Sequence, residues 1–193
     1  ISDDKRKELI KTGYEQTKEY FEKTFVTEGM KILLQKGMTR LAGKTTDAVF
    51  HLKQAMGGGK THLMVCFGLL AKDKNLRKEK IPAIRYSQDF DAAKIAAFNG
   101  RNHPDNYFWG EIAKQLGHEP LFAKFWIGGP KAPDKAAWLD LFDKIQDPLL
   151  ILLDELPPYF HYYSTQTLGH GTIADVATNA FANLLTAAKD KSN

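Results

Sequence analysis

The sequence predicts an α/β fold in which helices cover a mostly parallel sheet. Two apolar runs, 48–52 (AVFHL) and 149–153 (LLILL), are too short for typical helices and are typical of buried strands. Residues 61–72 and 173–189 instead have the apolar spacing of helices. Alternation of helices with short buried strands is typical of a layered α/β architecture with a parallel sheet.

The amino-terminal part is predicted to be helical. Apolar residues recur at helical spacing between residues 3 and 23, and Thr27 has the position of an N-cap for a second helix that runs to Leu41. We therefore divide the chain into an amino-terminal helical segment, 1–43, and an α/β core, 44–193.

Further elements are predicted between the two apolar strands and after them. Residues 82–86 (PAIRY) are predicted to form a strand, and 105–116 and 134–145 to form helices that each open with an aspartate beside a proline. Residues 159–171 follow two prolines and are polar, aromatic and glycine-bearing, which is typical of a mobile loop.

Composition indicates an ordinary globular domain. Of 193 residues, 43% are hydrophobic and 26% charged, and 27 basic residues are interleaved with 23 acidic ones. This mixture favours a solvated surface over a nucleic-acid footprint. No apolar run is long enough to cross a bilayer and no signal peptide is evident, so we expect a cytoplasmic protein without a membrane partner. The chain starts at Ile1 and is expected to be a piece of a longer protein.

A glycine-rich segment lies between the first predicted strand and the helix that follows it. Gly59, Lys60 and Thr61 match the end of the P-loop pattern, and two more glycines precede them, whereas Gln54 stands where the pattern has its first glycine. The placement between a strand and a helix is the context that phosphate binding requires.

The residue types of this loop suit phosphate. Backbone N–H groups of successive glycines can converge on phosphate oxygens because no Cβ intervenes, and the helix that follows adds its positive end. Lys60 is predicted to contact the β- and γ-phosphates and to act in catalysis, and the Thr61 hydroxyl to ligate Mg²⁺. A glycine turn before a helix capped by Thr61 is the alternative. The predicted nucleotide-binding residues are Gly57, Gly58, Gly59, Lys60, Thr61 and His62.

Two acids end the strand at 149–153. In an open parallel sheet the carboxyl ends of the strands form the ligand crevice, so Asp154 is predicted to lie beside the phosphate loop and to hold Mg²⁺. Glu155 is predicted to polarise the water that attacks the γ-phosphate, which favours hydrolysis. The alternative is that both acids mark a strand that meets solvent.

Other candidate residues are assigned to the core. The histidines share no ligand spacing, so no zinc site is predicted, and Cys66 is predicted to be a small buried hydrophobe. Aromatic residues are predicted to pack between helices rather than to stack on bases, because no basic stripe accompanies them. These are Tyr107, Phe108, Trp109, Phe122, Phe125, Trp126 and Trp138.

Segments 20–34 (YFEKTFVTEGMKILL), 54–64 (QAMGGGKTHLM) and 107–117 (YFWGEIAKQLG), with the acidic strand end, resemble a known family. The sequence is similar to the AAA+-type P-loop ATPases of bacterial anti-phage islands, the group that includes the BrxC and PglY ATPases of phage-exclusion systems. The resemblance implies ATP and Mg²⁺ as ligands and an amino-terminal ATPase fragment of a larger protein. It also implies methyltransferase, nuclease or helicase partners, DNA bound through regions outside this chain, and a sensor strand and a trans-acting arginine beyond Asn193. A homo-oligomer is left open.

Two functions follow from these observations. The first is a Mg²⁺-dependent ATPase whose hydrolysis drives conformational change in a DNA-directed defence assembly. The second is a nucleotide-gated scaffold that binds ATP to assemble partners with negligible turnover. Glu155 favours the first.

Overall fold

A computed structural model describes residues 17, 19–24, 27–52 and 59–191 of the chain. Its central element is a parallel pair of strands, β1 (Lys94–Asn99) and β2 (Leu149–Asp154). The register aligns Lys94 with Leu149 and Asn99 with Asp154, so both strands end at the same edge. This edge is where ligands bind in open parallel sheets.

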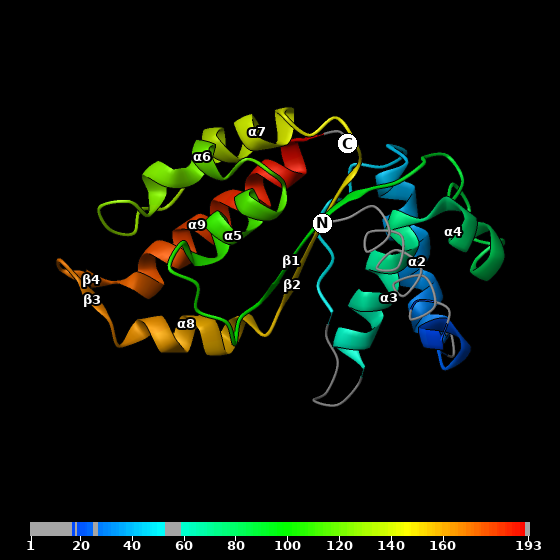
Figure 1. Cartoon of the computed structure of the whole chain (residues 1–193), viewed down its shortest axis with the longest axis horizontal. Coiled ribbons are helices and arrows are strands. Elements are labelled where there is room, and N and C mark those ends of the chain that lie inside the picture. The colour runs from blue at the N-terminus through cyan, green and yellow to red at the C-terminus, as the bar shows by residue number, and fades with distance from the viewer. Residues whose placement is uncertain (1–16, 18, 25–26, 53–58, 192–193) are drawn as a thin grey trace, which may run out of the picture.

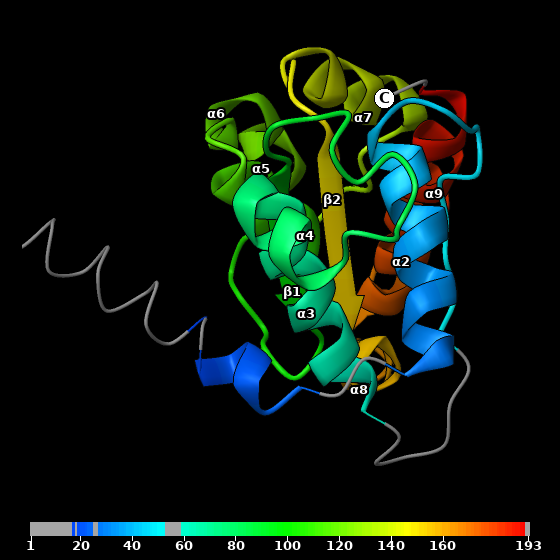
Figure 2. The ribbon, with the colours of Figure 1, turned by 90° about the vertical axis from the view of Figure 1, so that its right-hand side faces the viewer.

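Helices cover both faces of the strands (Figures 1 and 2). On one face lie α2 (Glu28–Leu41), α3 (Lys60–Lys72) and α4 (Lys74–Lys80), and α3 contacts both strands. The other face is covered by five helices with a short 3₁₀ turn after the second: α5 (Tyr107–Gln115), α6 (Glu119–Phe122), α7 (Lys135–Asp143), α8 (Leu156–Ser164) and α9 (Ile173–Asp190). The described residues thus form three layers, helix on strand on helix.

The strands supply side chains to two separate hydrophobic cores. Ala96 and Phe98 of β1 are buried against α5 and the helices behind it, whereas Ile95 packs against the core of α2, α3 and α4. Strand side chains alternate between the two faces, and both faces are covered. This is why LLILL is apolar without interruption.

Local signals placed several helices correctly. Thr27 caps α2 by accepting a hydrogen bond from the Met30 backbone N–H at 3.3 Å, and Asp134 caps α7 in the same way through Ala137 at 2.8 Å. The predicted helix 173–189 corresponds to α9. Of the predicted helix 3–23, residues 19–22 are helical and most others lie outside the described residues.

The predicted strand 48–52 is wrong: among the described residues, no backbone hydrogen bond pairs it with another strand. Residues 48–52 and β2 line a common cavity of about 700 Å³, and residues of α2 and α9 line it as well. Val49 is exposed, and the strand residues 149–154 are only half-buried. The apolar pattern alone did not reveal whether a neighbouring strand would be in reach.

The predicted strand 82–86 is also wrong, because successive turns occupy this segment. The backbone N–H of Ile84 donates to Ile81 O at 3.1 Å and that of Ser87 to Ile84 O at 3.3 Å. Pro82 lacks the N–H that a strand ladder would use. The second strand is instead β1 (KIAAFN), which the sequence did not reveal because alanine has low strand propensity.

Residues 159–171 are not the loop that was predicted. They contain most of α8 and the antiparallel strands β3 (Thr167–Leu168) and β4 (Gly171–Thr172). Pro157 and Pro158 lie in the first turn of α8, where a missing N–H costs no helical hydrogen bond. The prolines therefore begin a helix here.

The aromatic residues assigned to the core largely lie there. Trp109 and Trp138 are fully buried, and each indole N–H donates to a backbone carbonyl at 3.2 Å, of Phe125 and Ala180 respectively. Cys66 is also fully buried, as predicted. No helix within the described ranges is long and apolar enough to cross a membrane.

Candidate functional site

The site is built around one contact between residues 93 positions apart. The Thr61 hydroxyl, in the first turn of α3, donates to Asp154 Oδ2 at the end of β2 at 2.5 Å. Both residues were predicted as magnesium ligands, and the fold places their oxygens together. The contact exists because α3 packs along both strands with its amino terminus at their carboxyl ends.

The start of α3 has the backbone geometry that anions favour. Gly59 is in the left-handed region with φ of +77°, where glycine is unstrained. Among the described residues, no side chain caps the start of α3, so the first backbone N–H groups are not satisfied in that way. Lys60 is the first helical residue and shares this end with Thr61. Gln54, Gly57 and Gly58 lie outside the described residues.

Glu155, which directly follows the candidate metal ligand Asp154, has an unusual backbone conformation. Its backbone is left-handed, with φ of 53°, and it stands as the N-cap of α8. Its backbone N–H donates to Asp154 Oδ1 at 3.0 Å, so the two oxygens of that carboxylate accept from different elements. The Glu155 carboxylate lies 3.8 Å from the guanidinium of Arg101. This ion pair was not foreseen.

The chain after β1 is held tightly against the end of β2. Gly100 N–H donates to Asp154 O at 2.8 Å, and a Cβ at this position would lie 2.0 Å from Glu155 O. Only glycine permits so close an approach of two backbones. The tight approach brings Arg101, the next residue, to the edge where Asp154 and Glu155 lie.

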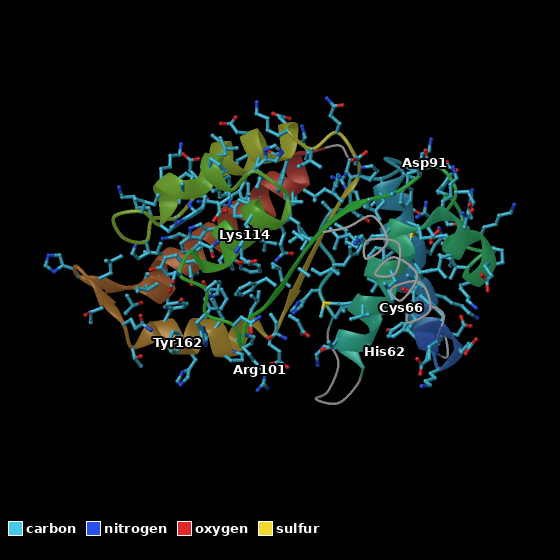
Figure 3. All side chains as sticks on the ribbon, viewed as in Figure 1. His62, Cys66, Asp91, Arg101, Lys114 and Tyr162 are labelled. Carbon is cyan, nitrogen blue, oxygen red and sulfur yellow. The ribbon has the colours of Figure 1, made fainter. Side chains whose placement is uncertain are left out.

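The amino-terminal segment packs on the residue that follows Thr61. The Tyr20 ring stacks on His62 at 4.6 Å between ring centroids, and its hydroxyl donates to His62 O at 2.6 Å. Thr24 Oγ1 lies 3.0 Å from His62 Nε2. His62, predicted to bind nucleotide, is thus in contact with the segment before α2. Figure 3 shows His62 and Arg101 at the same end of the molecule.

The oxygen donors at this edge suit Mg²⁺ better than they suit a metal ion whose ligands all come from protein. Within the part of the chain that the structure describes, no three histidine, cysteine or acidic residues gather into a metal site. Mg²⁺ is commonly bound through one or two protein oxygens together with waters and substrate phosphates. The hydroxyl of Thr61 and the carboxylate of Asp154 are oxygen donors of this kind, already within contact of each other.

Sequence reasoning missed Gly100 and Arg101 because their importance comes from the backbone approach of β1 to β2. It missed Tyr20 and Thr24 for a similar reason, since they contact His62 across 42 and 38 residues. The one usable signal was the glycine directly after KIAAFN, which would mark a close approach only if that segment had been identified as a strand.

Comparison with known proteins gives one match. Residues 7–98 are similar to the family model described as the DUF499 N-terminal domain. No curated protein matches the chain, and no solved structure does. The matched region contains the glycine-rich loop and Thr61 and ends within β1, before the acidic residues of β2.

Proposed function

We propose that this chain binds ATP with Mg²⁺ and takes part in ATP hydrolysis as the nucleotide-binding part of an AAA+-like P-loop protein. The observation that carries the proposal is the 2.5 Å hydrogen bond between Thr61 and Asp154. A hydroxyl at a helix start and a carboxylate at a neighbouring strand end are the two protein groups that share a magnesium ion in P-loop NTPases.

Each residue has one role in this proposal. Lys60 binds the β- and γ-phosphates, and the backbone N–H groups of residues 57–61 surround them. Thr61 and Asp154 hold Mg²⁺, which when bound neutralises charge on the phosphates. Glu155 orients the attacking water, since it lies next to the metal-binding carboxylate and has 40% of its side chain exposed to solvent.

A nucleotide-gated scaffold with negligible turnover is the second candidate. The ion pair of Glu155 with Arg101 favours it, because a carboxylate engaged by a guanidinium is less available to hold an attacking water. The two candidates share the same binding site and differ only in what Glu155 does after ATP has bound.

The wider setting is proposed from the sequence resemblance to the anti-phage ATPases. In this setting the chain is the amino-terminal ATPase part of a cytoplasmic defence protein, and hydrolysis drives conformational change in an assembly with methyltransferase, nuclease or helicase partners on DNA. The match of residues 7–98 to the DUF499 N-terminal domain is compatible with an amino-terminal part. DNA contacts would involve regions outside this chain, and a homo-oligomer is left open.

Nucleotide binding is tested with Lys60→Ala in the full-length protein. The matched control is Lys72→Ala, which removes an exposed lysine at the other end of the same helix. Affinity for a fluorescent ATP analogue with Mg²⁺ should be lost in Lys60→Ala and kept in Lys72→Ala. Equal affinity in the two variants would refute the phosphate-loop assignment.

Turnover is tested with the two acids separately. Glu155→Gln should keep ATP binding and reduce hydrolysis by about a hundredfold or more, as expected for loss of a general base. Asp154→Asn should weaken Mg²⁺-dependent binding itself. Hydrolysis at the wild-type rate in Glu155→Gln would contradict its catalytic role, and absence of hydrolysis in every variant despite ATP binding would favour the scaffold.

A further inference from the structure

Arg101 is a cation at the predicted phosphate edge to which the proposed function assigns no role. It lies two residues beyond Asn99, whose register partner is Asp154, and its guanidinium is 3.8 Å from the Glu155 carboxylate. Figure 3 shows Arg101 at the end of the molecule where His62 and the start of α3 lie.

Hydrogen bonds hold the backbone around Arg101, whose side chain is 70% exposed. The Arg101 N–H donates to Asn99 Oδ1 at 2.9 Å, and Gly100 is held against Asp154. Two residues further on, the His103 ring stacks on Tyr162 of α8 at 3.8 Å between ring centroids. The guanidinium therefore starts from a rigid base, as a residue that must recognise a ligand in a fixed place would.

The ion pair itself is weak and replaceable. The Arg101 side chain is 70% exposed and that of Glu155 40%, and the separation of 3.8 Å is near the upper limit for such a pair. Exposed pairs of this kind contribute little to stability because water screens them. The pair therefore positions two groups without locking them together.

We propose that Arg101 exchanges the Glu155 carboxylate for the γ-phosphate of bound ATP, which frees Glu155 to orient water. The proposal rests on the proposed nucleotide site. A terminal phosphate has more charge than a carboxylate and accepts two parallel N–H bonds from a guanidinium, so it competes well for Arg101. ADP lacks this phosphate, and Arg101 then stays with Glu155.

The test measures equilibrium binding of two nucleotides to the full-length protein. Wild type, Arg101→Met and Arg101→Lys are titrated with ADP and with a slowly hydrolysed ATP analogue, both with Mg²⁺. Arg85→Met is the control, because Arg85 is an exposed arginine whose guanidinium contacts Tyr86. A hydrogen bond to a charged group is equivalent to about 10-fold or more in affinity. Arg101→Met should therefore lower the preference for the triphosphate by about tenfold, with ADP affinity nearly unchanged.

Two further arms separate exchange from simple attraction. Arg101→Lys should recover part of the preference, because it restores the charge without the fork of donors. Glu155→Gln should tighten triphosphate binding when Arg101 is present, because it removes the carboxylate that competes with the phosphate for Arg101. The same change in Arg101→Met should tighten binding by less, because no guanidinium is left to compete for.

An unchanged triphosphate preference in Arg101→Met overturns the proposal, and so does an equal loss of affinity for both nucleotides. Equal effects of Glu155→Gln with and without Arg101 also overturn the exchange. Wild-type protein that binds neither nucleotide would refute the proposed function itself, which is a distinguishable result.

Discussion

Arg77 of α4 is the residue whose replacement should reduce stability most clearly. Its side chain is fully buried and its guanidinium sits 4.0 Å from the centroid of the Phe90 ring. Burial lowers the pKa of Arg77, but arginine starts so high that the group stays charged. Its N–H groups donate to five backbone carbonyls, those of Leu70, Ala71, Ser87, Phe90 and Asp91.

The loss of stability on replacing Arg77 depends on how many of these carbonyls would be left without any hydrogen-bond donor. Ala71 O also accepts from the Ala93 N–H at 2.9 Å, whereas Ser87 O and Phe90 O have no other backbone donor among the described residues. A buried acceptor left without a donor costs about 1–3 kcal/mol. With these two residues both buried, Arg77→Met should lower the free energy of unfolding by about 3 kcal/mol.

Urea denaturation followed by circular dichroism measures this loss, with Arg85→Met as the control for removal of an exposed arginine. The control should change stability by less than about 0.5 kcal/mol. Arg77→Lys should fall between wild type and Arg77→Met, because one ammonium cannot reach all the carbonyls that lie around the edge of the planar guanidinium. A loss below about 1 kcal/mol in Arg77→Met would refute the reasoning, since it would mean that these carbonyls find water without cost.

Two further predictions concern the core of α2 and α3. Gly37→Ala should destabilise the chain by about 1–3 kcal/mol, because the new Cβ would lie 2.2 Å from the Phe67 ring. Gly29→Ala on the same helix is the control and should be neutral or stabilising, because its Cβ would meet nothing closer than 4.0 Å. Equal shifts of the denaturation midpoint in the two variants would contradict this prediction. Burial raises the pKa of the Cys66 thiol to about 11. Iodoacetamide at pH 8 should therefore label Cys66 in urea but not in the native protein. The stability that the neutral thiol contributes is fully present below about pH 9 and should be lost as the pH rises toward 11. Rapid native labelling would show that the thiol is accessible.

The sequence by itself determined the elements whose signals are local. Thr27 and Asp134 begin helices because their side-chain oxygens accept a hydrogen bond from a backbone N–H in the first turn. This contact spans three residues and does not depend on the rest of the fold. LLILL formed a strand because an uninterrupted apolar run suits only a segment covered on both faces. The residue types of Thr61 and Asp154 likewise predicted two oxygen donors for Mg²⁺, because a hydroxyl and a carboxylate belong to the residues themselves.

Only the tertiary structure decided which segments become neighbours. Residues 48–52 have the stronger local strand signal, yet the alanine-containing segment β1 is the one that pairs with β2, because pairing depends on how α3 and α5 position the chain around the strands. The hydrogen bond of Thr61 with Asp154 and the ion pair of Arg101 with Glu155 join residues 93 and 54 positions apart. Contacts over such separations depend on the packing of several elements at once, which no local sequence pattern records.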